Sequence, residues 1–398
     1  MSPDLQRLKA SRDRFHAELY DRVLPFWMKN APDREYGGTF NCLDRDGRIW
    51  DTTKHMWLQG RLVWMMSKLY NTTLPDPAVL DVAKLGADFL TQKAYRADNR
   101  VYFSLTREGQ PKAMQRKIFS ECFYSMALAE FARATEDPRL RYEARRMLET
   151  VVEYAKDATL VGRPAYPHLP PTSSLAPYMI ILNMVDELHE PGETTYDAIA
   201  QWCAEGIEKH IKPELELVLE HVGANGELLD SPDGRVVNPG HAIECAWFLM
   251  AYAKKKGDKA SVQRALKMID WSFDFGWDSE FGGIYYFLDR EGMSPPALEW
   301  SMKLWWPHCE AMIAYLMAWR ETGEQAHWDK FQMLTDWSFE HFSDPEFGEW
   351  FGYLDRRGER THTYKGAPYK GFFHVPRALY LCDNILTEAV AEMESQAK

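Results

Sequence analysis

The chain has 398 residues, of which 45% are hydrophobic and 14% aromatic, and it carries a formal net charge of −12. A nucleic-acid-binding protein needs a basic face to displace the counterions of phosphates, so this charge disfavours nucleic acid as a partner. No apolar leader follows Met1, and no apolar stretch approaches the roughly 18 residues needed to cross a bilayer. The six cysteines have no metal-binding spacing and indicate reduced thiols. We therefore expect a cytoplasmic protein without a membrane or nucleic-acid partner.

One phrase recurs along the chain. Its clear copies are DREYGGTFNCLDRDGR at 33–48, DSEFGGIYYFLDREGM at 278–293 and DPEFGEWFGYLDRRGE at 344–359. Weaker copies begin at Ala97 and Ala224, and a sixth would fall near residue 162. Because glycines and an Asp-Gly type of turn suit tight reversals, each copy predicts a short β-hairpin. Six units of similar length indicate a repeat architecture.

Two kinds of helical segment alternate between these phrases. Amphipathic segments precede them, at 11–27, 78–94, 140–156, 196–210, 260–275 and 326–342. More uniformly apolar segments follow them, at 54–70, 118–132, 175–188, 240–253, 307–320 and 374–386. A helix that is apolar all round is buried, and a helix with one apolar stripe covers it. The pattern predicts an all-α fold, an (α/α)6 barrel with short β-hairpins at one mouth, as a single domain over residues 1–398.

In such a barrel the starts of the inner helices converge on the mouth that carries the hairpins. The fourth inner helix begins with Asn238 as a predicted N-cap and Pro239 in its first position, which places His241 in the first turn. His374 lies at the start of the sixth. Two histidines at matching places indicate an acid–base pair.

Other polar residues near the mouth have both functional and structural interpretations. Arg61 lies in an otherwise apolar inner helix, where a buried guanidinium needs partners. His308 is expected to be structural, since Trp306 and Glu310 can share a helix face that excludes it. Structural links are also expected for Arg377, Asp289 and Arg290. A metal site formed by His241, Glu244 and His308 has only weak support from spacing, so we predict no metal.

The chemistry expected of the histidine pair is proton transfer at carbon. The positive end of a helix dipole lowers the pKa of a histidine, so we expect a neutral His241, with Glu244 opposing this shift and setting its tautomer. Two bases that face one cavity can remove a proton from one face of a carbon acid and return it to the other. The chain has no GxGxxG, P-loop, HExxH or nucleophile-elbow motif.

Several segments in order resemble the N-acylglucosamine 2-epimerase family: WLQGRLVW, NPGHAIE, KLWWPHCE, GGIYYFLDREG, FGEWFGYLDRRGE and KGFFHVPR. The family includes cellobiose and mannose 2-epimerases, aldose–ketose isomerases and renin-binding proteins. The resemblance implies an (α/α)6 barrel in which His241 and His374 are catalytic. It further implies a sugar site formed by Arg61, Glu244, Trp306, Glu310 and Tyr369. It also implies a homodimer that requires no cofactor. Family members are often activated by ATP as an allosteric effector, although this chain shows no nucleotide motif.

The branch of the family is indicated by an absence in the sequence. Cellobiose epimerases carry a third active-site histidine on the third inner helix, where this chain reads SLAPYMIILNM. We therefore expect a sugar 2-epimerase that interconverts N-acyl-D-glucosamine and N-acyl-D-mannosamine through C2 of the open-chain aldose. The alternatives are a mannose/glucose or cellobiose 2-epimerase, an aldose–ketose isomerase, an inverting glycoside hydrolase using Glu244 and Glu310, and a non-catalytic binding protein.

Overall fold

The computed structural model describes residues 3–164, 167–190 and 192–396. Its inner helices are α3 (Met56–Thr72), α5 (Phe119–Thr135), α7 (Leu175–Leu188), α10 (Pro239–Lys256), α12 (Trp305–Thr322) and α14 (His374–Gln396). Its outer helices are α1 (Leu5–Ala17), α4 (Pro77–Phe89), α6 (Pro138–Lys156), α8 (Asp197–Glu208), α11 (Lys259–Gly276) and α13 (Gln325–Phe342). Shorter helical pieces are the π-helices Glu18–Val23 and Leu90–Ala94, α2 (Leu24–Asn30), the 3-10 turn Ala158–Val161 and α9 (Pro232–Arg235).

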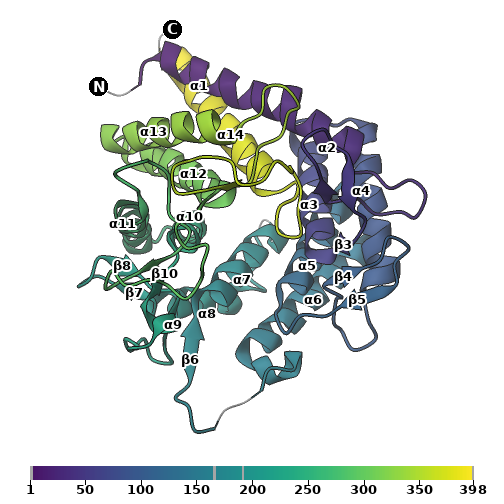
Figure 1. Cartoon of the computed structure of the whole chain (residues 1–398), viewed down its shortest axis with the longest axis horizontal. Helices are drawn as coiled ribbons and strands as arrows, with labels where there is room; N and C mark the ends of the chain where they lie inside the picture. The colour runs from purple at the N-terminus through teal and green to yellow at the C-terminus, as the bar shows by residue number, and fades with distance from the viewer. Residues whose placement is uncertain (1–2, 165–166, 191, 397–398) are drawn as a thin grey trace.

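The helices form the predicted (α/α)6 barrel. Successive inner helices pack on one another, and each also packs on an outer helix. The ring closes where α1 lies along α14 (Figure 1) and where the Trp64 ring of α3 contacts Phe373, just before α14, at 5.4 Å. The outer helix α6 buries one stripe, Ala144, Met147, Leu148, Val151 and Val152, as its three- and four-residue spacing predicts.

The strands at the mouth connect neighbouring repeats. They are β1 (Cys42–Leu43), β2 (Ile49–Asp51), β3 (Lys54–His55), β4 (Ser104–Leu105), β5 (Pro111–Ala113), β6 (Thr172–Ser174), β7 (Ile211–Lys212), β8 (Leu217–Val218), β9 (His221–Gly223), β10 (Val236–Val237), β11 (Leu288–Asp289), β12 (Lys303–Leu304) and β13 (Tyr353–Leu354). A strand just before an inner helix pairs, antiparallel, with a strand of the next repeat in β3–β4, β6–β9, β10–β11 and β12–β13. The inner helices are thereby held with their starts at one mouth.

The predicted hairpins are only partly right. The copy at 33–48 leads into the hairpin β1–β2, and the copy that begins at Ala97 forms β4–β5. In the copy at 278–293 the strand pairs instead with the preceding repeat. In the copy at 344–359 the strand pairs with the preceding repeat and also bridges Arg360 across its own turn. The hairpin predicted from Ala224 is wrong: β7–β8 precedes it, and the segment forms a turn and α9, because its Ser231-Pro232 start caps a helical turn. Of the copy near residue 162, positions 165–166 lie outside the described residues, and the described remainder of 162–171 contains no strand.

The first aspartate of each clear copy is a buried anchor between repeats. It accepts hydrogen bonds from a lysine of its own repeat and from an arginine in the hairpin region of the next. The sets are Asp33 with Lys54 (2.8 Å) and Arg107 (2.9 Å), Asp278 with Lys303 (3.1 Å) and Arg356 (3.0 Å), and Asp344 with Lys365 (3.0 Å) and Arg45 (2.7 Å). All three lysine side chains are 0% exposed. Because Arg45 belongs to the first repeat and Asp344 to the last, the same contact closes the ring.

Burial would raise the pKa of Asp33, but the hydrogen bonds from Arg107 and Lys54 lower it to about 2. The carboxylate is therefore charged, and its cations are required. Among the described residues, no helix combines the length and the apolarity that a membrane crossing requires.

Replacing the anchor lysine tests this dependence. Lys54→Met should lower the free energy of unfolding by roughly 3 kcal/mol, because it removes the buried one of the two cations that pair with Asp33 and leaves Arg107 alone. Lys84→Met, which removes an exposed pair with Asp88, should change it by less than about 1 kcal/mol. Denaturant melts of both variants measure the difference, and equal melts would contradict the role of the anchor.

Candidate active site

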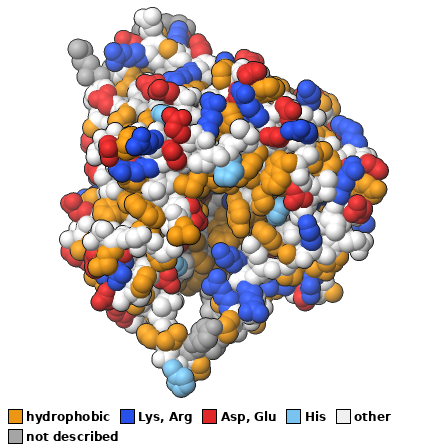
Figure 2. All heavy atoms as spheres, in the orientation of Figure 1, with side chains coloured by type: hydrophobic (Ala, Val, Ile, Leu, Met, Phe, Trp, Pro, Cys, Tyr) orange, Lys and Arg blue, Asp and Glu red, His pale blue; other side chains and the backbone are white. Residues whose placement is uncertain are grey.

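The mouth of the barrel is hollowed. Figure 2 shows a depression in the middle of this face, walled largely by hydrophobic side chains, with Lys and Arg side chains along its lower edge. His241, Trp306 and His374 belong to the first turns of α10, α12 and α14. The Trp306 ring lies 5.3 Å from the His241 ring and 5.9 Å from the His374 ring, measured between centroids. The two predicted histidines therefore share one cavity around Trp306.

His241 is held by its helix start and by a carboxylate that the sequence did not reveal. The Asn238 side chain accepts from the His241 backbone N–H at 3.1 Å, which confirms the predicted N-cap. The imidazole Nδ1 lies 2.9 Å from Oε2 of buried Glu220. Burial opposes the charged imidazole, but the Glu220 carboxylate outweighs it and raises the His241 pKa above its usual value. The predicted lowering of this pKa is wrong, because a carboxylate at hydrogen-bond distance outweighs the partial charge of a helix dipole.

His374 has the opposite electrostatic setting. Its Nδ1 lies 2.7 Å from Oε1 of Glu310, and both side chains are buried. Burial, together with the positive charges of Arg61 and Arg377, holds the pKa of His374 well below its usual value. Since a carboxylate only accepts, Nδ1 of each histidine carries the proton of that hydrogen bond. His374 is thus a neutral imidazole whose Nε2 has a free lone pair.

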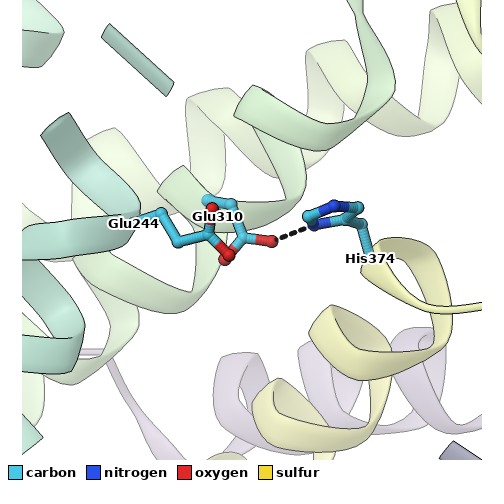
Figure 3. Close-up of side chains that lie close together, drawn as sticks. All are labelled: Glu244, Glu310 and His374. Atoms are coloured by element: carbon cyan, nitrogen blue, oxygen red, sulfur yellow. Dashed lines mark hydrogen bonds and ion pairs between the residues drawn. The ribbon is translucent and has the colours of Figure 1, made fainter. Parts of the chain in front are cut away.

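Arg377 joins the helices beneath the histidines. Figure 3 shows Glu244 of α10, Glu310 of α12 and His374 of α14 converging from three inner helices. The Arg377 Nη2 donates to Oε1 of Glu244 at 2.6 Å and to Oε1 of Glu310 at 2.7 Å. Arg377 is therefore a structural link, as predicted, and it also lies against the candidate acid–base residues. Glu244 was expected to set the His241 tautomer. Instead Glu220 contacts Nδ1 of His241, and Glu244 accepts a hydrogen bond from Arg377.

Trp247 is a further partner of Glu310, and like Glu220 it was not predicted from the sequence. Trp247 Nε1 donates to Glu310 Oε2 at 2.9 Å. His308 has a structural role, as predicted. Its Nε2 accepts from the Ile284 N–H, and its Nδ1 faces the Leu304 carbonyl oxygen. Asp289 accepts from Arg235 across the β10–β11 pair, which confirms its structural role. Arg290 likewise contacts Glu291 and the Gly234 carbonyl.

The carboxylates of the site could in principle attract a cation. Potential ligand atoms of Glu244, Glu310 and His374 lie within 4.8 Å of one another. Arg377 already donates to both carboxylates, so a guanidinium supplies the positive charge there. The weakly supported set of His241, Glu244 and His308 is not formed, since both ring nitrogens of His308 are engaged elsewhere.

Arg61 presents an unpaired cation to the cavity. Its guanidinium carbon lies 4.3 Å from the Phe123 ring centroid and 5.0 Å from those of Trp57 and Phe373. Within the described chain it has no hydrogen-bond partner, and its Nε is buried. Burial is the main cause that lowers the Arg61 pKa to about 9. A desolvated guanidinium of this kind suits an oxygen-rich ligand that carries or develops negative charge.

Tyr369 lies at the outer edge of the mouth. It is 57% exposed, and its ring meets the edge of Trp57 at 5.5 Å. Trp57 Nε1 donates to the Pro368 carbonyl, which ties the loop that carries Tyr369 to α3. The predicted residues thus gather at one mouth, with Tyr369 at its rim.

Comparison with known proteins identifies the family of this chain. Residues 38–378 match the family model of N-acylglucosamine 2-epimerase (GlcNAc 2-epimerase). The chain belongs to this family. It is 44% identical to N-acylglucosamine 2-epimerase of Bos taurus, covering 99% of this chain and 95% of that protein. It is 42% identical to the Homo sapiens protein of the same name, covering 97% and 92%.

The fold has a solved counterpart as well. The structure of cellobiose 2-epimerase from Bacillus thermoamylovorans superposes with a TM-score of 0.82 at 18% identity, covering 96% of this chain and all of that one (100%). At this identity the similarity concerns the barrel alone.

The two arginines of this epimerase-family site, Arg61 and the buried Arg377, should respond differently to substitution. Arg61→Met should lower kcat/KM on the sugar at least tenfold yet leave thermal stability unchanged or higher, because it removes an unpaired buried charge. Arg377→Met should lower stability by about 3–5 kcal/mol, because it strands Glu244 and Glu310. Melting curves beside steady-state kinetics distinguish the two. An Arg61→Met protein with unchanged kinetics would remove Arg61 from the sugar site.

Proposed function

We propose that this protein interconverts N-acyl-D-glucosamine and N-acyl-D-mannosamine by moving a proton at C2 of the open-chain sugar. The observation that carries the proposal is the histidine pair: one cavity holds His241 with a raised pKa and His374 with a lowered pKa. Groups whose environments push their pKa values apart suit opposite roles as acid and base. The relatives at 44% and 42% identity, both named N-acylglucosamine 2-epimerase, support the choice of substrate.

The chemistry follows from the carbonyl at C1. Removal of the C2 proton breaks the C2–H bond, and its electron pair passes into the C1–C2 bond as the charge moves to O1. In this mechanism Nε2 of His374 takes the proton from one face. His241 then delivers its Nε2 proton to C2 from the other face, and the C1 carbonyl is restored. The unpaired guanidinium of Arg61 is suited to stabilise the charge on O1.

Trp306 gives the sugar a position between the two bases. Its ring lies about equally far from both imidazoles, at 5.3 and 5.9 Å between centroids. A sugar chain stacked on that ring would present opposite faces of C2 to the two histidines. Inversion at C2 needs this two-sided access, since one base can act on one face only.

The rival reaction classes fit the site less well. An inverting glycosidase needs a protonated carboxylic acid and a carboxylate about 6.5–9.5 Å apart, with water between them. Here Glu244 and Glu310 share the Arg377 guanidinium, and their oxygens lie within 4.8 Å. An aldose–ketose isomerase uses the same proton removal and returns the proton to C1. A 2-epimerase for mannose or cellobiose differs only in the substituents it accommodates.

The proposal extends to the remaining predictions from the sequence and from the family resemblance. The sequence predicts a cytoplasmic location, a single domain over residues 1–398 and no metal, and the resemblance implies a homodimer, no required cofactor and activation by ATP as an allosteric effector. Size-exclusion chromatography with light scattering measures the oligomeric state, and assays with and without ATP or a chelator measure the dependence on ATP and on metal.

The first experiment uses substrate in D2O. N-acetylmannosamine should give N-acetylglucosamine that carries deuterium at C2, because the delivered proton equilibrates with solvent on His241. NMR of separate incubations with N-acetylmannosamine, mannose and cellobiose identifies both the sugar and the labelled carbon. Product without deuterium at C2 would rule out the two-histidine mechanism, and deuterium at C1 of a ketose would establish an isomerase.

Single histidine variants should separate the two half-reactions. His241→Asn and His374→Asn should each lower the epimerisation rate by at least about 10²-fold, the low end for an acid–base group. Each variant should still exchange the C2 proton of one epimer with solvent, and the two should act on opposite epimers. The buried structural histidine variant His308→Asn is no suitable control, so His362→Asn, at an exposed site, serves instead. Normal epimerisation by either folded variant would exclude that residue from the mechanism.

A further inference from the structure

Glu220 lies at a crossing point between two inner helices. It separates β8 from β9, and its carbonyl oxygen accepts from the N–H of Leu175, the first residue of α7, at 3.0 Å. Its own N–H donates to the Val236 carbonyl in the strand that leads into α10, at 3.4 Å. The backbone of Glu220 is thus held from both sides, and its carboxylate meets His241 at the start of α10.

A carboxylate at this position is not a requirement of the repeat. In two other repeats a different residue supplies the carbonyl that accepts from the first N–H of an inner helix. For α3 it is Phe103, which accepts from Met56 N–H at 2.9 Å, and for α12 it is Gly352, which accepts from Trp305 N–H at 3.2 Å. Those repeats thus place an aromatic ring or no side chain where this one places a buried acid. Burying an acid costs free energy unless it is paired, and the described partner of the Glu220 side chain is His241.

The carboxylates behind the two histidines also differ in their other contacts. Glu310 accepts from Arg377 and Trp247 as well as from His374, so its charge is largely balanced. Glu220 has no Lys or Arg among its described ion-pair partners, and the side chain in direct contact with its carboxylate is His241. The two His–Glu pairs thus have similar contact geometry, but only the carboxylate of Glu310 is paired with an arginine as well.

We propose that Glu220 is the positioning residue for His241: it holds the Nδ1 proton so that Nε2 faces the sugar, and it keeps this imidazole protonated at rest while His374 is neutral. The inference rests on the proposed function and deepens it, because it assigns which histidine holds the proton before turnover. After turnover the proton taken by His374 returns to solvent and His241 takes one up, so the cycle needs no other reactant.

Other charges face His241 from every side. Glu244 on α10 also favours the protonated imidazole, while Lys117, before α5, disfavours it. His374 on α14 also lies close, so that the charge of a protonated His241 lowers the pKa of His374. Glu220 is the charge in direct contact, at 2.9 Å, which makes it the position to change.

The pH dependence of kcat/KM gives the first readout. Activity requires neutral His374 and protonated His241, so it is lost toward acid as His374 protonates and toward base as His241 deprotonates. Glu220→Gln keeps the size and removes the charge, which should lower the His241 pKa and move the basic limb about one pH unit lower. Above that limb kcat/KM should fall about tenfold, one unit of pKa being a factor of ten. The acidic limb should stay in place.

Glu18→Gln is the matched control. Glu18 is also a buried carboxylate, accepting from Ser343 at 2.6 Å and Trp350 at 2.8 Å in the outer layer. Its substitution should cost stability without moving either limb. A Glu220→Gln protein whose kcat/KM falls equally at every pH, with both limbs in place, would show a merely structural role and overturn the proposal.

Nitrogen-15 NMR of histidine-labelled protein gives a second readout that needs no substrate, with His241→Asn used for assignment. Neutral His241 should carry its proton on Nδ1, and its titration should move lower in Glu220→Gln. Wild-type protein with the neutral proton on Nε2 would overturn the proposal even where Glu220→Gln does not fold. If the His241 titration moves in Glu220→Gln but the wild-type protein epimerises no aldose, the proposed function fails and the role of Glu220 stands. If the wild-type protein epimerises an aldose but the His241 titration does not move, the proposed function stands and the role of Glu220 fails.

Discussion

The double hydrogen bond of Arg377 is the contact on which the site depends. One guanidinium nitrogen binds Glu244 and Glu310 at 2.6 and 2.7 Å and thereby ties α14 to α10 and α12 at the centre of the barrel. Without it, two carboxylates would repel one another in a buried space. The orientation of His374 follows from the same contact, since its Nδ1 binds the Glu310 oxygen that Arg377 also holds. Around the histidines lie the guanidinium groups of Arg61 and Arg377 and the carboxylates of Glu220, Glu244 and Glu310. With a protonated His241 the charges balance in number, so a transient negative charge on a sugar can be stabilised there.

The chemistry of the site arises where repeats depart from their common pattern. His241 and His374 occupy matching helix starts, but the acids behind them come from the link between β8 and β9 in one case and from an inner helix in the other. A second departure is Glu349, at the place where two other copies of the phrase have a second glycine. It is fully buried, has a positive φ of 53°, and binds Lys370 at 2.8 Å. This pair holds the segment that carries Tyr369 and leads into His374, so backbone strain is accepted next to a functional element.

Periodicity and helix-start chemistry were enough to predict the barrel, its mouth, the Asn238 cap and the convergence of His241, Trp306 and His374. Local patterns could not reveal Glu220, because its position relative to α10 depends on strand pairing between repeats. Trp247 was missed, and the partners of Arg377 were not predicted, for a related reason: both residues act through Glu310, on another helix. The direction of the His241 pKa shift was wrong because only the dipole of its own helix could be read from the sequence. Residues that act within one turn were predictable, and residues that act across the barrel were not.

The contact between Arg45 and Asp344 makes the last repeat a neighbour of the first in the same way that Arg107 joins Asp33 and Arg356 joins Asp278. α1, the first outer helix of the chain, lies along α14, the last inner helix (Figure 1). Order along the chain and order around the barrel are therefore separable properties. A circular permutant joined between α14 and α1, and opened in the short connection between another inner helix and its outer partner, would contain every interaction that shapes the sugar cavity.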